Sequence, residues 1–209
     1  MNLMSRSLLI AIFVFAVALT APAQNFKGGV RAGCTTSQMS GDELSGFHKL
    51  GAYVGAFVNW RFVNHEQWSI QPEINFVMKG SSAYLKADKN GNVVGNKYVL
   101  TLYYMEVPLL AKYRIFKGLE AEFGPTFGVL CGATEKDANG KMPGRMPFRR
   151  FELCGMVGLS YTFKEHFGID VRFVQTAIPV RVNDGYHSSA YLNKKQFSTE
   201  LAFSLFYQF

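Results

Sequence analysis

The chain contains little charge and few cysteines, and it has no helical pattern after its first 23 residues. Only 18% of its 209 residues are charged and three are cysteines, whereas 48% are hydrophobic and 20 are glycines. Three is an odd number, so the cysteines cannot all be paired within the chain, and an exported protein need not contain a disulfide. Hydrophobic residues recur at every second position rather than about every 3.6 residues, which excludes a helical bundle and predicts an all-β protein.

One long apolar run stands at the N-terminus. Arg6 precedes the run 8–21, which ends in the small-residue triplet Ala21-Pro22-Ala23. Such a segment is typical of a cleaved secretory signal peptide and is short for an uncleaved membrane anchor. We therefore expect a signal peptide at residues 1–23, followed by a single domain at residues 24–209.

Eight segments after residue 23 alternate between apolar and polar residues, as strands do when one face is apolar. In the clearest segment, Leu50, Val54 and Trp60 share one face, and Tyr53 and Arg61 lie on the other. The predicted strands lie near residues 26–36, 50–62, 68–79, 103–115, 119–129, 151–163, 167–173 and 197–209. Short turns at 64–66, 116–118 and 164–166 alternate with long loops at 37–49, 81–97, 132–147 and 177–195. Short turns at one end and long loops at the other predict an eight-stranded antiparallel up-and-down transmembrane β-barrel.

The size of the barrel decides which face points outward. Eight strands enclose a lumen that side chains just fill, and Trp, Phe, Tyr and Leu from every strand would overfill it. We therefore expect the apolar face to contact lipid, and a structure with Trp60, Phe76 and Phe203 facing the axis would contradict this. The other face carries glycines, the acids Glu73, Glu106, Glu120, Glu122, Glu152, Asp170 and Glu200, and the bases Arg31, Arg61, Lys79, Lys112, Arg114 and Arg172.

Acids and bases on that face are nearly balanced, and buried charges must be paired. The sequence therefore predicts an ionic network that occludes the lumen. We assign to it Glu73, Glu106, Lys112, Arg114, Glu120, Glu122, Arg172 and Glu200.

Aromatic residues flank the predicted short turns, where a girdle at the membrane surface belongs. They are Trp60, Phe62, Trp68, Tyr113, Phe116, Phe163, Phe167, Tyr207 and Phe209. Three prolines, Pro72, Pro108 and Pro125, fall inside predicted strands, and because each forfeits a ladder hydrogen bond we expect β-bulges there.

Several segments resemble the PorT-like outer-membrane β-barrel family. They are "FKGGVRAGCTTSQMSG" from Phe26, "YYMEVPLLAKYR" from Tyr103, "EFGPTFGVL" from Glu122 and the closing Phe209, although Cys34-Thr35 departs from the Asn expected early in the first strand. The resemblance implies an integral protein of the bacterial outer membrane and a terminal aromatic residue read by the barrel-assembly machinery. It supplies no catalytic residues.

Candidate chemical sites are weak. His187 and Ser188 are the residues to test for a lipid-modifying enzyme, but neighbours in sequence rarely form a catalytic pair. Residues 88–92 and 137–141 carry oxygen ligands without the spacing of an EF-hand, and their Asn-Gly pairs favour hairpin tips. We expect no catalytic residue, cofactor or metal.

Basic residues gather in two of the long loops. The set is Arg145, Arg149, Arg150, Lys194 and Lys195, and the whole chain has a net charge of +7. These bases could hold lipopolysaccharide phosphates or another anionic partner, or could simply be solvated. Nucleic acid is not expected outside the cytoplasm.

The function predicted from the sequence is that of a non-enzymatic integral outer-membrane barrel with an occluded polar lumen. Its expected role is structural or one of interaction, with outer-membrane lipid and a loop-bound ligand or protein as partners. Two alternatives stay open, namely a small lipid-modifying enzyme and a soluble secreted ligand-binding barrel.

Overall fold

The computed structural model describes residues 26–40, 47, 49–83, 86–87, 93–94, 98–137, 140–141, 148–180 and 197–209. The elements in these residues are all strands, and no helix among them is long and apolar enough to cross a membrane. The long strands are β1 (Phe26–Ser40), β2 (Lys49–Arg61), β3 (Trp68–Ala83), β6 (Tyr98–Phe116), β7 (Leu119–Asp137), β9 (Phe151–Phe163), β10 (Phe167–Thr176) and β11 (Phe197–Gln208). The short ones are β4 (Lys86–Ala87), β5 (Val93–Val94) and β8 (Gly140–Lys141).

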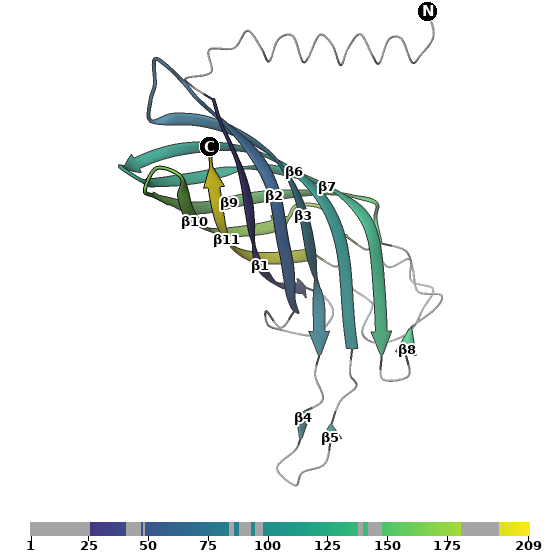
Figure 1. Ribbon diagram of the computed structural model, residues 1–209. Coiled ribbons are helices and arrows are strands. Elements are labelled where there is room, and N and C mark those ends of the chain that lie inside the picture. The colour runs from purple at the N-terminus through teal and green to yellow at the C-terminus, as the bar shows by residue number, and fades with distance from the viewer. Residues whose placement is uncertain are drawn as a thin grey trace, which may run out of the picture.

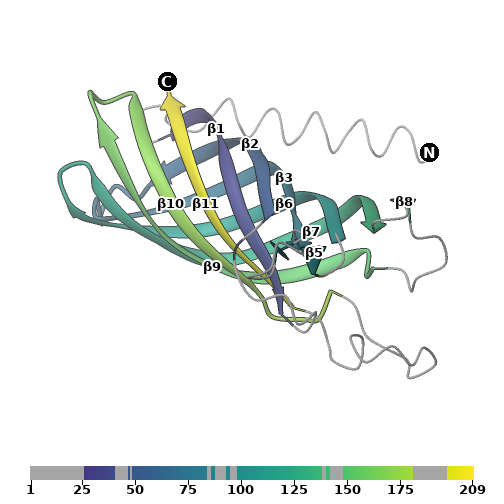
Figure 2. The same cartoon turned by 90° about the horizontal axis from the view of Figure 1, so that it is seen from below.

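The long strands form one closed antiparallel barrel, as predicted. Their order around the ring is β1, β2, β3, β6, β7, β9, β10 and β11, and β11 pairs with β1 to complete it. Figure 1 shows the C-terminus at one end of the barrel and the β4–β5 hairpin extending from the other end. In Figure 2 the yellow β11 runs beside the purple β1. Closure removes every free edge among the eight long strands.

The strands are staggered as well as paired. From Arg31, paired neighbours lead through Gly55 and Asn75 to Glu152 of β9 in one direction. In the other direction they lead to Thr162 of the same strand. The offset of ten positions between these two end points is the shear of the barrel, which sets the tilt of its strands.

Apolar side chains point outward on every long strand. Trp60, Phe76 and Phe203 have exposed fractions of 42%, 37% and 43%, whereas Tyr53 and Arg172 are buried. The burial pattern alternates residue by residue along β9 and β10. The orientation predicted from lumen size is therefore confirmed.

Two interior glycines make room for large rings. A Cβ atom on Gly29 would clash with the ring of Phe57, and one on Gly168 would clash with the ring of Phe206. The two phenylalanines meet edge to face inside the barrel, with ring centroids 5.9 Å apart. Side chains thus fill the narrow lumen only because other positions lack them.

Six strands are longer than predicted at the long-loop end. The largest extensions are residues 37–40, 80–83, 98–102 and 130–137, which were expected in loops or outside strands but belong to β1, β3, β6 and β7. β2 and β10 are longer by residue 49 and residues 174–176. A strand needs only about 10 residues to cross a bilayer, whereas β6 and β7 each have 19. These strands therefore project beyond the membrane on that side.

Both predicted hairpin tips lie between paired strands. β4 pairs with β5 around residues 88–92, and Asp137 of β7 pairs with Gly140 of β8. The tips themselves lie outside the described residues.

The prediction of β-bulges at the three prolines is wrong. The ladder omits pairs beside Pro72, Pro108 and Pro125, but its register continues unchanged past each of them. In an antiparallel sheet each residue bonds to one neighbouring strand, so a missing N–H weakens one side without requiring an extra residue. The register shifts occur elsewhere, between Tyr103 and Tyr104 and between Arg114 and Phe116.

Aromatic rings gather at the short-turn end, as predicted. Trp60 stacks on Phe26, with ring centroids 5.8 Å apart, and Trp68 lies 4.9 Å from Tyr113. Phe167 lies 4.9 Å from Tyr207. This ring of amphipathic and apolar side chains marks a membrane surface.

Candidate functional site

The Arg172 side chain spans the middle of the lumen. It extends from β10, and its Nη1 and Nη2 atoms donate to both carboxylate oxygens of Glu73 at 2.7 and 2.9 Å. β3, which carries Glu73, stands opposite β10 in the ring. Arg172 also donates from Nε and Nη2 to Glu122 of β7 and from Nη1 to the hydroxyl of Tyr53, at 2.9 Å. A fully buried guanidinium thus satisfies two carboxylates by bidentate contacts.

Arg31 adds a second crossing contact at this level. Its Nη2 lies 3.0 Å from Glu73 and its Nη1 lies 3.3 Å from Asp170. Asp170 also accepts a hydrogen bond of 2.7 Å from Ser204. Two arginines and the carboxylates of Glu73, Glu122 and Asp170 therefore form one central cluster that ties together strands from all sides of the barrel.

Lys79 forms a separate cluster nearer the long-loop end. Its Nζ lies 2.7 Å from Glu106, in close contact with Glu152 and 3.9 Å from Glu200. The same ammonium stands 4.4 Å from the ring centroid of Tyr104. One base thus links carboxylates from β6, β9 and β11 across the bore.

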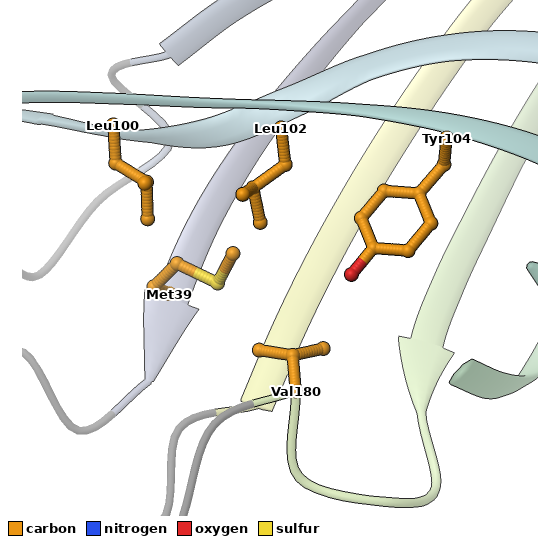
Figure 3. Close-up of a cluster of buried hydrophobic side chains, with 5 residues drawn as sticks. All are labelled: Met39, Leu100, Leu102, Tyr104 and Val180. Carbon is orange, nitrogen blue, oxygen red and sulfur yellow. The ribbon is translucent and has the colours of Figure 1, made fainter. Parts of the chain in front are cut away.

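An apolar plug closes the lumen beyond Lys79. Met39, Leu100, Leu102, Tyr104 and Val180 are all buried and pack against one another, as Figure 3 shows. Val180 follows β10, and its carbonyl accepts a hydrogen bond of 2.8 Å from the backbone N–H of Arg149. Residues 177–180 therefore fold back over the barrel mouth.

The short-turn end of the lumen is open. A cavity of about 860 Å³ enters the barrel there, with Phe57, Gln71 and Phe206 among its lining residues. Glu120, also in its wall, lies close to Arg61, 3.1 Å from Lys112 and 3.9 Å from Arg114.

An apolar outer face around an ionic lumen is the arrangement of an outer-membrane barrel. The outer membrane protein beta-barrel domain family matches residues 22–178. The chain belongs to this family. It is an integral protein of the bacterial outer membrane, so its short turns face the periplasm and its long loops face outward.

Solved outer-membrane barrels are similar to this family member. The Neisserial surface protein A (NspA) is 13% identical, with 88% of this chain and 97% of that chain covered and a TM-score of 0.50. The Ail protein of Yersinia pestis is 14% identical, with 88% and 98% covered and a TM-score of 0.49. Ail of Yersinia pestis in complex with the heparin analogue sucrose octasulfate is 14% identical, with 88% of this chain and 99% of that chain covered and a TM-score of 0.49. No curated protein sequence matches the chain significantly.

The eight residues assigned to the lumen network all face the interior of this outer-membrane barrel, but in different groups. Glu73, Glu122 and Arg172 lie in the central cluster, and Glu106 and Glu200 lie beside Lys79. Lys112, Arg114 and Glu120 line the cavity at the periplasmic end. Lys79, Arg31, Glu152 and Asp170 belong to these groups too, and only their position on the same predicted face indicated this.

The loop bases of the outer-membrane barrel are placed only in part. Arg149 and Arg150 are exposed just before β9, at the extracellular end. Arg145, Lys194 and Lys195 lie outside the described residues, as do His187 and Ser188. The apolar plug was not predicted from the sequence, because four of its five residues lie outside the predicted strands.

Proposed function

We propose that this outer-membrane barrel conducts no ions and catalyses no reaction, and that it serves as a scaffold for interaction at its outer loops. The observation that carries the proposal is the blocked lumen. Arg172 bridges opposite walls, Lys79 bridges a second level, and the apolar plug covers the extracellular mouth. An ion would have to displace buried, mutually bonded charges and then cross an apolar layer, and both steps are costly.

Planar-bilayer recording tests the proposal. Wild-type protein whose insertion has been verified by flotation with vesicles is expected to give no steady single-channel current. A variant with the central bonds removed and the plug reduced, R172A combined with L102A and V180A, is the positive control and is expected to leak. A stable unitary current from the wild type would contradict the proposal.

A second assay distinguishes an enzymatic role from the scaffold role. Phospholipid hydrolysis by the purified wild type is measured in mixed micelles and compared with His187→Ala and Ser188→Ala. The proposal expects no turnover in any of the three proteins. Hydrolysis by the wild type that either substitution abolishes would replace the scaffold role with the enzyme alternative.

We propose that Arg149 and Arg150 contribute to an anion-binding surface at the extracellular end. Both are exposed, adjacent and directly before β9, so two guanidinium groups are presented together. Arg149→Gln/Arg150→Gln is expected to weaken binding of lipopolysaccharide-containing vesicles. Equal binding by this variant and the wild type would remove these residues from the surface.

We also propose the narrower assignment to the PorT-like branch of the outer-membrane barrels. The quoted segment from Tyr103 forms most of β6 and carries Glu106 and Lys112 into the lumen. A PorT-like barrel would have Phe209 read by the assembly machinery. Phe209→Ala is then expected to lower the amount of folded barrel in the outer membrane.

A further inference from the structure

The cavity at the periplasmic end differs in charge from the rest of the lumen. Seven bases and only two acids line this cavity, whereas the buried charges described elsewhere in the lumen are six acids and two bases. The acids are Glu120 in the wall and Glu165 in the turn between β9 and β10. The acids deeper in the lumen balance part of this excess, because Arg31 pairs with two of them and Lys112 with one.

The protein itself compensates only part of this charge. At the mouth of the cavity Glu120 is shared among three bases, Arg61, Lys112 and Arg114. Lys112 also lies 3.5 Å from Glu122 of the central cluster. Within the part of the chain that the structure describes, the cavity residues Lys27 and Lys117 form no ion pair.

Arg31, at the inner end of the cavity, pairs with Glu73 and Asp170 but still has unused hydrogen-bond donors. Only 4% of its surface is exposed, and its Nε and Nη1 atoms have no hydrogen-bond partner among the described residues. Its guanidinium lies 4.9 Å from the ring centroid of Phe57. A buried guanidinium with unused donors is costly unless something accepts from it.

We propose that this cavity binds a small, multiply charged anion carrying phosphate groups, which enters from the periplasm. Arg61 and Arg114 supply planar forks suited to phosphate oxygens, and the lysines supply point charges. The cavity volume lies within the range of small-molecule sites, and walls of low dielectric strengthen attraction inside it. The site is independent of the proposed scaffold function, because the central cluster separates it from the outer loops.

Calorimetric titration of the full barrel in an uncharged detergent, with inorganic pyrophosphate as probe, tests the proposal. Saturable binding of one pyrophosphate per barrel is expected, and it weakens as salt is added. Lys27→Gln/Lys117→Gln removes two charges that make no ion pair, so it leaves folding intact and is expected to weaken binding about tenfold.

Arg149→Gln/Arg150→Gln is the matched control, because it removes the same charge at the opposite end. Its affinity for pyrophosphate is expected to stay within about twofold of the wild type. Equal weakening by the two double variants would show attraction to net charge alone and would overturn the site. Absence of saturable binding by the wild type would overturn it as well.

A bulky uncharged substitution tests whether the anion binds inside the cavity or at its rim. Thr162→Trp in the cavity wall keeps the charge and fills space, so it is expected to reduce affinity. Unchanged affinity in that variant would place the anion outside the lumen, against the proposal.

Competition with a phospholipid decides whether the cavity binds a free anion or a lipid headgroup. Phosphatidic acid in the micelles is expected not to displace pyrophosphate, because lipid surrounds the barrel while the cavity opens along its axis. Displacement at equal concentration would assign the site to a lipid headgroup instead of a free anion. None of these outcomes changes the conductance result.

Discussion

At the scale of the residue, Arg172 shows why charges can stay inside this barrel. Its guanidinium is fully buried, and it donates to both oxygens of Glu73 and to Glu122. Removing one partner of such a group leaves the others charged and dehydrated. The central cluster therefore stabilises the fold only as a complete set.

Substitution of Arg172 tests this interdependence. Arg172→Met keeps the volume but leaves Glu73 and Glu122 without their main partner, so it is expected to lower the free energy of unfolding by about 3–5 kcal/mol. Urea unfolding in lipid vesicles measures the change, with the exposed Arg149→Gln as control. Adding Glu73→Gln and Glu122→Gln to Arg172→Met is expected to recover part of the loss. A loss below about 1 kcal/mol would contradict the account.

The turn after β9 offers a stabilising change. Lys164 and Glu165 have φ angles of 52° and 64°, in the left-handed region that costs a non-glycine residue roughly 1–2 kcal/mol. Glu165→Gly is therefore expected to stabilise the barrel by about 0.5 kcal/mol after the entropy of the unfolded chain is counted. Glu66→Gly, in a turn without a positive φ, is the control and is expected to stabilise nothing. Equal effects in thermal unfolding would refute the strain.

Sequence alternation predicted the face of each charged residue but not its partner. Glu73 and Arg172 are 99 positions apart, and they meet only because β3 and β10 stand opposite each other in a ring of this shear. Alternation has a period of two and contains no information on stagger. The face of each charged residue was therefore predictable, while the membership of Arg31, Lys79, Glu152 and Asp170 and the division into three groups were not.

At the scale of the element, each long strand is a boundary between lipid and an ionic interior. Val157 of β9 has an exposed fraction of 55% and pairs with Phe123 and Phe173, far from either strand end. Phe163 ends the same strand within the aromatic ring, next to Phe167. The two positions share a face and differ in depth.

Arginine substitutions on β9 test the depth. Val157→Arg is expected to cost about 2–4 kcal/mol, because its charge meets the bilayer middle, and Phe163→Arg about 0–1 kcal/mol, because its charge reaches the interface. Equilibrium unfolding in vesicles measures both. Equal costs would mean that the outer face of β9 does not cross a bilayer.

Strand ends were the least predictable feature, and β6 shows why. At residues 98–102 the inner positions Leu100 and Leu102 belong to the apolar plug. The outer positions are the apolar Val99 and the polar Thr101, so the two faces do not differ and the alternation disappears. A pattern method finds a strand only where its two faces differ. The strand ends that carry the apolar plug were therefore not recognised from the sequence.

At the scale of the whole molecule, the barrel is closed toward the outside and open toward the periplasm. The plug and the two buried ion clusters fill the outer and central lumen, and the cavity of about 860 Å³ occupies the periplasmic end. Strand count and loop lengths predicted the closed barrel and its orientation. The one-sided cavity depends on side-chain packing that the sequence does not display.

The native cysteines lie on both sides of the wall and provide the most direct measurement. Cys34 is exposed on the outer face of β1, and Cys154 is buried in the lumen. In vesicles, single-thiol variants that retain only Cys34 or only Cys154 are treated with an apolar maleimide and with a charged thiosulfonate. The account predicts that the apolar reagent modifies Cys34, the charged reagent does not, and Cys154 reacts with neither until the barrel is unfolded. Rapid modification of Cys154 in the folded barrel by the charged reagent, or equal modification of Cys34 by it, would contradict a sealed lumen inside a lipid-facing wall.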